Sequence, residues 1–342
     1  MSHRIWIDLA TGPQVLFYVP IICELKKRGN TVLITTRQFT ETVSLADRYG
    51  LSHTVIGAHG GSTMSGKLFA IIDRSFKLVK FARRQEVDLA LGSSYSQALV
   101  APVLKVPLVI CGDYEGNPAN HLSCRVAKRI LVPDLFHKPN LKKFGASPSK
   151  VVSYNGMKEN VYLADFKPEV GYLKQLGLDE ESIIVTMRPP SEVSSYHQFK
   201  NPLFDQLVVW IAEKSFTEII LLPRGAEQRL KFTSMGFKNI RIPDTVLDGP
   251  NLIYHSDLVI SAGGTMNREA VVLGTPVYTL FMGELGSIDK NLIESGKLTQ
   301  IESSTDFSKI KLIKKTPQPL SISNNGRTLV EEVVDLIMEA CD

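Results

Sequence analysis

The stretch from Leu258 to Ala270 places an apolar strand, a turn of small residues and the start of a helix in succession. Gly263 and Gly264 let the backbone approach a phosphate closely, and the free N–H groups of a helix start favour negative charge. Glu269, about one turn into the helix, can accept hydrogen bonds from both hydroxyls of a ribose. The pattern is neither a Walker motif nor a G-x-G-x-x-G fingerprint. It predicts a site for a ribose phosphate; the alternative is a plain strand-to-helix connection with a solvated Glu269.

Two arginines follow other apolar runs of the same half of the chain. Arg188 comes directly after residues 183–187, and Arg224 comes shortly after residues 219–222. Both lie just past the carboxyl end of a predicted strand, the edge where open α/β sheets bind ligands. Because a guanidinium fork can donate two parallel hydrogen bonds, both arginines are candidates for holding phosphate oxygens. The alternative for each is a surface salt bridge.

Two carboxylates follow a buried strand in the first half, within Cys111-Gly112-Asp113-Tyr114-Glu115. A spacing of two in an extended loop can bring Asp113 and Glu115 towards one side. Close carboxylates push one pKa upward, which produces a general acid and a general base. The alternative is a polar surface loop with a helix-capping role.

Basic and large apolar residues interleave between residues 67 and 84. A basic amphipathic helix of this kind can lie on an anionic membrane surface. The interpretation that we favour from the sequence is a core helix with a solvated basic face. The basic residues are Lys67, Arg74, Lys77, Lys80, Arg83 and Arg84.

Alternating strands and helices must position these residues. The alternation predicts an α/β fold of two doubly wound, Rossmann-like domains with parallel sheets. Prolines and glycines interrupt it over 133–180, so we expect domains at 1–150 and 151–342. The expected strands are 5–9, 31–35, 53–56, 88–91, 107–111, 130–132, 182–187, 218–222, 239–242, 258–261 and 277–280. An amphipathic helix over 326–341 can pack back on the first domain.

Composition excludes several classes of protein. The 342 residues are 44% hydrophobic and 22% charged, which is ordinary for a globular chain. The net charge of +4 is too small to predict nucleic-acid binding. The four cysteines are widely spread, so we expect reduced thiols and no metal site. Neither a signal peptide nor an apolar run long enough to span a membrane is present in the sequence, which predicts a cytoplasmic location.

Three stretches carry a resemblance to known proteins: IWIDLATGPQVLFYVPIICELKKRGNTVLITTR, YNGMKENVYLADFKP and SAGGTMNREAVVLGTPVYTLFMGELGSIDKNLIESGKL. They resemble a prokaryotic family of unknown function that is related to glycosyltransferases of the GT-B fold. The resemblance implies GT-B architecture with a ligand cleft between the domains. The loop around Asp113 also resembles that of non-hydrolysing UDP-N-acetylglucosamine 2-epimerases, where carboxylates transfer protons.

The resemblance also implies residue roles. Gly263, Gly264 and Thr265 would meet the diphosphate, and Glu269 would hold the ribose. We include Ser261 and Met266, which flank the turn, in the nucleotide-sugar site. In GT-B enzymes the loop that holds Gly12 here faces the ligand. Gln14 stands near a position where related enzymes often have a histidine, and glutamine cannot act as a base.

We therefore expect a metal-independent glycosyltransferase that takes a UDP-linked sugar, with Asp113 or Glu115 as the base and no cofactor. The acceptor is unidentified; a lipid-linked acceptor would suit contact with the inner membrane face through residues 67–84. The alternatives are a UDP-sugar 2-epimerase and a non-catalytic nucleotide-sugar binding protein.

Overall fold

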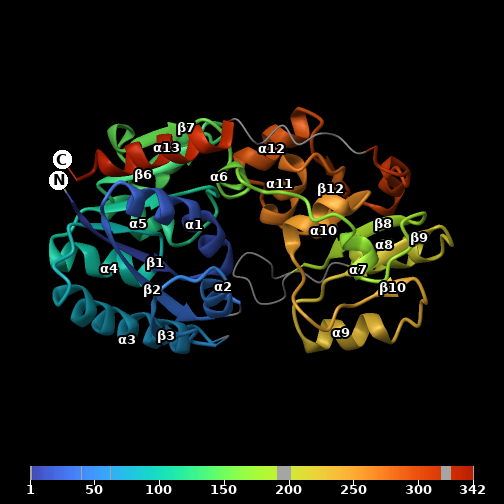
Figure 1. Ribbon diagram of the computed structural model, residues 1–342, viewed down its shortest axis with the longest axis horizontal. Coiled ribbons are helices and arrows are strands. Elements are labelled where there is room, and N and C mark those ends of the chain that lie inside the picture. Colours follow the sequence, from blue (N-terminus) through green and yellow to red (C-terminus); the bar gives the residue numbers. More distant parts are fainter. Residues whose placement is uncertain (1, 40, 62, 191–201, 317–324, 342) are drawn as a thin grey trace. The chain divides into compact units, whose positions relative to one another are not determined.

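The computed structural model describes residues 2–341 except 40, 62, 191–201 and 317–324. The chain divides into two compact units, each with its own sheet (Figure 1). Unit 1 comprises Met1–Ala164, Gly286–Ile288 and Asn324–Asp342. Unit 2 comprises Asp165–Leu285 and Asp289–Ser323.

Unit 1 is built on a parallel sheet whose described strands have the order β3-β2-β1-β4-β5-β6-β7. The strands are β1 Arg4–Leu9, β2 Thr31–Gln38, β3 Thr54–Ala58, β4 Leu89–Leu91, β5 Leu108–Cys111, β6 Arg129–Pro133 and β7 Val151–Tyr154. The helices are α1 Gly12–Lys27, α2 Thr42–Arg48, α3 Met64–Arg83, α4 Tyr95–Leu104, α5 Asn120–Val126, α6 Lys158–Tyr162 and α13 Asn325–Met338, with short 3-10 helices at Lys138–Phe144 and Pro148–Lys150.

Helices cover both faces of this sheet. On one face α1 contacts α2, α6 and α13, and on the other α4 contacts α3 and α5 (Figure 1). The central strands are apolar runs such as Leu89–Leu91 and Leu108–Cys111, fully buried because both faces are covered. The C-terminal helix α13 buries Val333, Val334 and Ile337 in the same core as α1. The chain therefore returns to unit 1 at its C-terminal end.

Unit 2 repeats the arrangement with the described strand order β10-β9-β8-β11-β12-β13. The strands are β8 Ile183–Arg188, β9 Thr217–Leu221, β10 Ile240–Arg241, β11 Leu258–Ser261, β12 Val277–Thr279 and β13 Thr299–Gln300. The helices are α7 Tyr172–Gln175, α8 Pro202–Ala212, α9 Ala226–Thr233, α10 Gly249–His255, α11 Gly264–Val272 and α12 Ser287–Glu294, with a 3-10 helix at Ser304–Lys309. Ser287 and Ile288, at the start of α12, belong to unit 1.

Two parallel-sheet, Rossmann-like units are the fold class that the strand–helix alternation predicts. The structure differs in one strand of unit 1. Residues 151–154 form β7, which pairs in parallel with β6, whereas the sequence places the second domain's start at 151. Because β7 completes the first sheet, the contacts divide the chain after Ala164. Pro133 ends β6, Pro139 and Pro148 lie in short 3-10 helices, and Gly145 caps the first of these helices.

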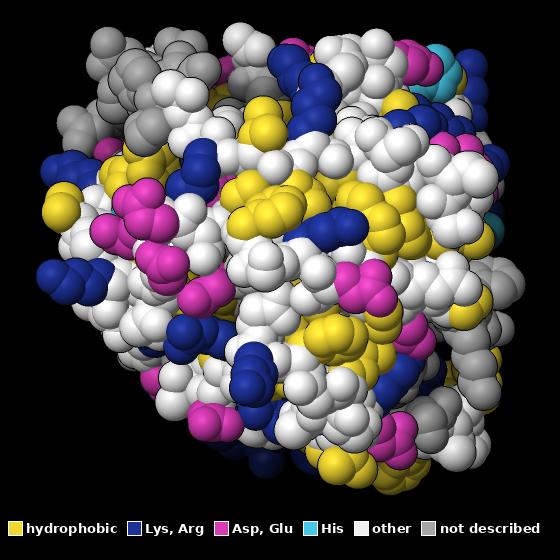
Figure 2. Space-filling model, turned by 90° about the vertical axis from the view of Figure 1, so that its right-hand side faces the viewer, with side chains coloured by type: hydrophobic (Ala, Val, Ile, Leu, Met, Phe, Trp, Pro, Cys, Tyr) yellow, Lys and Arg dark blue, Asp and Glu magenta, His cyan; other side chains and the backbone are white. Residues whose placement is uncertain are grey.

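The face of the molecule drawn in Figure 2 carries Lys and Arg side chains interspersed with Asp and Glu side chains. Positive charge does not gather there into one patch, which agrees with the small net charge of +4. Cations that could serve an anionic ligand must therefore be sought locally, at the carboxyl ends of the strands.

Candidate functional site

The turn between β11 and α11 is the centre of the candidate site in unit 2. Gly263 is the N-cap of α11 in an extended conformation, and no side chain caps the helix at this position. Gly263, Gly264 and Thr265 are half-buried, so solvent reaches the helix start within this unit. The start of α11 therefore presents backbone N–H groups at the carboxyl edge of the sheet, the arrangement that favours an anion.

Arg224 lies beside this turn, as the sequence predicts for a phosphate ligand. A Cβ atom added to Gly263 would meet Nη2 of Arg224 at 3.5 Å, with nothing else within 4 Å. The Arg224 side chain is positioned by its Nε, which donates to the carbonyl oxygen of Pro189 at 3.0 Å. Gln228 accepts from the Arg224 backbone N–H at 2.9 Å and donates to the carbonyl of Pro190 at 2.9 Å. The guanidinium is thus held next to the glycine turn.

Arg188 reaches the same edge from the neighbouring strand. It ends β8 and pairs in register with Ser261, the last residue of β11. The Ala262 N–H donates to the Arg188 carbonyl oxygen at 3.3 Å, which ties the turn to this strand end. The Arg188 side chain is half-buried, and among the described residues no carboxylate pairs with it. The salt-bridge alternative is therefore not observed for Arg188 in this part of the chain.

Ser261 and Met266 are buried within unit 2. Ser261 is 0% exposed, and its hydroxyl donates to the Gly263 carbonyl oxygen at 3.3 Å. Met266 is 5% exposed. Ser261 thus helps to shape the turn, and Met266 is buried next to it in sequence.

Glu269 is also buried, at 7% exposure, which overturns the alternative of a solvated carboxylate. Its neighbour Arg268 forms an ion pair with Asp289 of α12, with Nε–Oδ1 at 2.8 Å and Nη2–Oδ2 at 3.1 Å. This pair lies under the turn, because a Cβ on Gly264 would meet Arg268 Nη2 at 3.5 Å and Asp289 Oδ2 at 3.6 Å. The pair fixes α11 against α12, and the sequence analysis did not identify it. One feature of the sequence indicates such a pair: Arg268 directly precedes Glu269, the residue expected to bind the ribose.

In unit 1, the loop after β1 is closed by side chains. A Cβ on Gly12 would meet Glu41 Oε1 at 2.7 Å, so a carboxylate already lies against this first residue of α1. Gln14 accepts from the Ala10 N–H at 2.8 Å and donates to the Ser93 hydroxyl at 2.8 Å. Gln14 therefore joins the loops after β1 and β4, a structural task that needs no base.

The predicted pair Asp113 and Glu115 have different partners. Asp113 is about one third exposed at its side chain and pairs with Lys158, with Oδ1–Nζ at 3.1 Å. The Lys158 ammonium also lies 5.3 Å from the centre of the Phe17 ring. Asp113 is therefore accessible from solvent within unit 1, and a cation stabilises its charged form.

Glu115 is 6% exposed, and it holds a helix start instead of facing solvent. Both of its carboxylate oxygens accept from the Ser287 N–H at 3.2 Å, and the Ser287 hydroxyl donates to Oε1. Asn140 donates to the same oxygen at 3.3 Å. These contacts realise the helix-capping alternative for Glu115, at α12 and not at the helix that follows it in sequence.

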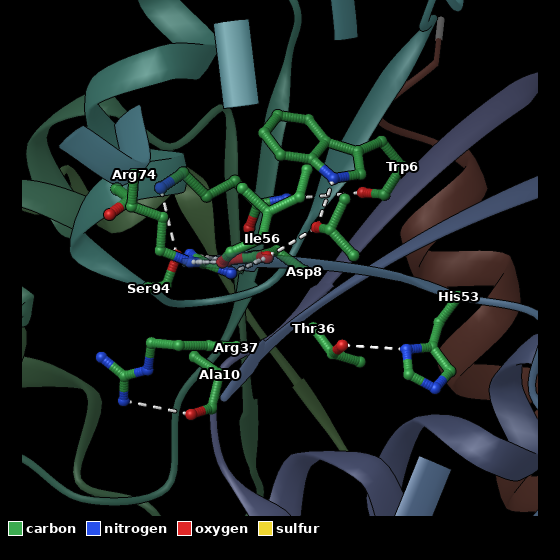
Figure 3. A network of polar contacts seen from close by, with 12 residues as sticks. Trp6, Asp8, Ala10, Thr36, Arg37, His53, Ile56, Arg74 and Ser94 are labelled. Atoms are coloured by element: carbon green, nitrogen blue, oxygen red, sulfur yellow. Dashed lines mark hydrogen bonds and ion pairs between the residues drawn. The ribbon is translucent and has the colours of Figure 1, made fainter. Parts of the chain in front are cut away.

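The most buried charges of unit 1 were missed by the sequence analysis (Figure 3). Asp8, at the end of β1, is 0% exposed and accepts from Arg74 Nη1 and Nη2 at 2.9 and 2.7 Å. Ser94 and Thr35 donate to it at 2.5 and 2.6 Å. Burial raises the pKa of Asp8, but the charge of Arg74 and these hydrogen bonds outweigh it and lower that pKa below its usual value. Asp8 is therefore a structural anion.

The structure departs in part from the favoured interpretation of residues 67–84 as a core helix with a solvated basic face, because Lys77, Lys80, Arg83 and Arg84 are exposed as expected and Arg74 is not. Arg74, assigned to that basic face, is 2% exposed and paired with Asp8. In α3 only Arg74, Leu78 and Ala82 are buried. Five large apolar residues between positions 64 and 76 are exposed: Met64 82%, Leu68 58%, Phe69 73%, Ile72 46% and Phe76 73%.

Among the described residues, His, Cys, Asp and Glu side chains nowhere gather in a group of three or more that could hold a metal ion. No helix in this part of the chain has the length and apolar character needed to cross a membrane.

Comparison with protein families matches residues 3–341, almost the whole chain, to one family, described as a protein of unknown function, DUF354. The chain belongs to DUF354. A curated relative of this DUF354 chain is the uncharacterized protein MJ0665 of Methanocaldococcus jannaschii, which is 29% identical over 301 residues covering 86% of each chain. The family and this relative establish ancestry and leave the activity open.

Solved structures similar to the DUF354 chain share its fold. UDP-N-acetylglucosamine 2-epimerase of Rickettsia bellii has a TM-score of 0.77 at 15% identity, covering 100% of this chain and 98% of the other. The Methanocaldococcus jannaschii epimerase in complex with UDP-GlcNAc and UDP has a TM-score of 0.76 at 18% identity, covering 98% and 99%. HepE of Anabaena in complex with UDP-glucose has a TM-score of 0.64 at 18% identity, covering 99% and 98%. These likenesses confirm a GT-B-like architecture of two Rossmann-like domains.

Proposed function

We propose that this DUF354 protein is a glycosyltransferase that transfers a sugar from a UDP-linked donor to an acceptor. The observation that carries the proposal is the start of α11. There a half-buried Gly263-Gly264-Thr265 turn without a capping side chain lies beside the Arg224 guanidinium. Both elements are within unit 2 and together form a site of the type that binds a diphosphate. Solved proteins of the same fold carry UDP-sugars, which supports the choice of ligand.

In the proposed reaction the diphosphate leaves as negative charge develops on it. The N–H groups at the start of α11, with Arg224 and Arg188, stabilise that charge, and because they are already in place they need no reorganisation. Glu269 binds the ribose hydroxyls of the nucleoside. The proposal includes no metal ion and no cofactor.

For the acceptor hydroxyl we propose Asp113 as the general base. Of the two carboxylates in its loop, Asp113 is the more exposed, whereas Glu115 is occupied by Ser287. Lys158 pairs with the Asp113 carboxylate and holds it in position in its loop. Glu115 then acts in positioning only, a narrower role than the paired acid and base that the sequence predicts.

A thermal-shift screen with UDP-, GDP-, dTDP- and CDP-sugars tests ligand binding. A ligand at one hundred times its dissociation constant adds about 2.7 kcal/mol of stability. Glu269→Gln keeps the volume of the buried side chain and is expected to lose most of the shift. Glu227→Ala changes an exposed carboxylate of α9 in the same unit and serves as the matched control. An equal shift in wild type and Glu269→Gln would refute the ribose assignment.

A UDP-sugar 2-epimerase is the second candidate, favoured by the epimerase structures that share this fold. It predicts turnover of the nucleotide sugar without an acceptor and entry of solvent deuterium at the epimerised carbon. Transfer predicts release of UDP only when an acceptor is present. Binding without either reaction would make the chain a non-catalytic nucleotide-sugar binding protein. Asp113→Asn should stop either reaction while leaving the thermal shift unchanged.

We also propose that unit 1 touches an anionic membrane surface through α3. Met64, Leu68, Ile72 and Phe76 recur every four residues, so the exposed apolar side chains form one stripe, with Phe69 beside it. Lys80, Arg83 and Arg84 follow at the C-terminal end of the helix and are exposed. An apolar stripe with cations at its end complements an anionic bilayer, whereas a second copy would bring like charges together.

Vesicle sedimentation tests this contact. Wild type should sediment with vesicles of phosphatidylcholine and phosphatidylglycerol, and not with phosphatidylcholine alone. Phe69→Ser with Phe76→Ser should abolish sedimentation, whereas Phe216→Ser, an exposed aromatic of unit 2, should not. Absence of sedimentation, or a dimer in light scattering that the double variant dissociates, would refute the proposal.

A further inference from the structure

Three basic side chains gather at the carboxyl ends of β2 and β3 in unit 1. Arg37 is near the end of β2, His59 directly follows β3, and Lys67 lies near the start of α3. The His59 N–H donates to the Gln38 carbonyl oxygen at 3.2 Å, which joins the two strand ends. The Phe39 ring stacks on His59 at 4.4 Å between centroids and lies 4.8 Å from the Arg37 guanidinium carbon. The aromatic ring thus holds Arg37 and His59 together.

Arg37 is short of acceptors. Its Nη2 donates to the Ala10 carbonyl oxygen at 3.1 Å, the one contact drawn for it in Figure 3. Its Nε is buried and has no hydrogen-bond partner among the described residues. Burial, and then the charge of Arg74, lower the pKa of Arg37. A guanidinium has five N–H donors. Most donors of the partly buried Arg37 side chain are therefore available to another partner.

Within the described residues no carboxylate forms an ion pair with this cluster, although the charge of Asp8 partly offsets the lowering of the Arg37 pKa by burial and Arg74. Asp8, the buried anion of unit 1, is bound by Arg74, Ser94 and Thr35. Among the described residues no ion pair joins Arg37, His59 or Lys67 to an acidic side chain. The carboxylate of Glu41 lies against Gly12. Burial, with the charges of Arg37 and Lys67, lowers the pKa of His59, which favours the neutral form of its ring.

The backbone around His59 is shaped for close approach. A Cβ on Gly60 would lie 2.2 Å from the Gly66 carbonyl oxygen and 2.7 Å from the Lys67 Cα, so only glycine fits there. This contact holds Lys67 against the loop. The Gly61 N–H donates to His59 Nδ1 at 3.2 Å. Because Nδ1 accepts, neutral His59 carries its proton on Nε2, where it can donate to a ligand.

We propose that Arg37, His59 and Lys67 form an anion-binding site of unit 1 that takes a phosphate group. The guanidinium, the imidazole Nε2–H and the ammonium offer donors of three kinds to several oxygens of one anion, which suits phosphate better than a lone carboxylate oxygen. The site lies where open α/β sheets bind ligands. That the phosphate belongs to the acceptor rests on the proposed function, because the donor diphosphate is assigned to unit 2.

Inorganic phosphate and a resonance of the His59 ring provide the test. The C–H resonance is assigned by its loss in His59→Gln, and potassium chloride of equal ionic strength is the reference. We expect a saturable shift of this resonance with phosphate in wild type. Arg37→Gln and Lys67→Gln should each weaken the apparent affinity about tenfold or more, as for loss of a charge-assisted hydrogen bond. Arg224→Gln, which alters only the unit 2 site, should leave the His59 response unchanged.

Two results would overturn the inference: no saturable shift in wild type, or equal affinity in wild type and both cluster variants. Lys67→Gln is the second variant because it changes a side chain near the start of α3 and leaves Arg37 in place. A loss of phosphate affinity in Lys67→Gln therefore does not depend on any misfolding caused by Arg37→Gln. Failure of UDP-sugar binding with an intact His59 response would refute the proposed function alone. Short-chain phosphatidic acid distinguishes the source of the phosphate. If it binds more tightly than inorganic phosphate, and Phe69→Ser loses this gain, the acceptor is lipid-linked. If the two bind equally, the acceptor is water-soluble.

Discussion

Replacing Arg74 by Met should destabilise unit 1 more than any exposed charge change on the same helix. The variant leaves the Asp8 carboxylate, 0% exposed, with Ser94 and Thr35 as donors but without its cation. Breaking a buried ion pair from one side costs about 3–5 kcal/mol, because a charge remains buried and uncompensated. For a unit of this size, that lowers the melting temperature by roughly 6–20 °C.

Tryptophan fluorescence can follow unit 1 separately from unit 2. The chain has 2 tryptophans, of which Trp6 lies in unit 1 and Trp210 in unit 2. Trp6 is 0% exposed, and its indole N–H donates to the Thr35 hydroxyl at 2.9 Å, next to Asp8 (Figure 3). In a Trp210→Phe background, urea unfolding monitored by Trp6 gives the free energy of unfolding of unit 1, even when the units unfold separately.

The matched control is Lys77→Met, which removes an exposed ion pair with Asp73 on the same helix, at 2.7 Å. Exposed pairs contribute at most about 1 kcal/mol. Asp8→Asn combined with Arg74→Met removes both charges and should recover more than half of the loss. A loss below about 1 kcal/mol in Arg74→Met, or a double variant no more stable than the single one, would show that the pair is not an important charge interaction.

Three further outcomes follow from the contacts. Burial lowers the pKa of Lys315 to about 8 from 10.5, so the unfolded chain binds more protons between these values. Unfolding free energy should therefore rise with pH across that window in wild type relative to Lys315→Gln; equal pH profiles would contradict the shift. Gly60→Ala should lower the free energy of unfolding by about 1–3 kcal/mol through overpacking, and it should remove the His59 response to phosphate. Unchanged stability together with an unchanged His59 response would contradict the tight turn. Arg268→Met should lower the free energy of unfolding of unit 2, measured by Trp210 fluorescence, by about 3–5 kcal/mol. An unchanged unfolding transition would contradict the buried pair with Asp289.

Local pattern predicted the strands, the Gly263–Gly264 turn and the position of Arg224, because each depends on neighbours in sequence. Apolar runs fix buried parallel strands, and the glycine turn follows β11 directly. Two edge strands, β7 and β13, were missed. The strand β7 is short and follows several prolines and glycines. Its identity depends on pairing with β6, which no local pattern encodes.

Contacts between distant residues decided the roles of the charged side chains. Arg74 looked like one more basic residue of a helix, yet 66 positions separate it from the Asp8 that it neutralises. Glu115 looked like half of an acid–base pair until Ser287, 172 positions away, was found to donate to it. A sequence pattern lists the charges, but only the fold shows which of them are already compensated.

Pairing inside the fold gives a criterion for function that applies to both units. In unit 1 the arginine paired with Asp8 is structural, whereas Arg37, at the same edge of the sheet, keeps a buried donor without an acceptor among the described residues. In unit 2 Asp289 takes Arg268, while Arg188 reaches the strand ends without a carboxylate partner there. Since burying an uncompensated cation costs stability, a fold retains one where a ligand supplies the missing charge. On this reasoning we propose an anion site at the carboxyl edge of the sheet in each unit, and the test of each is independent of the other.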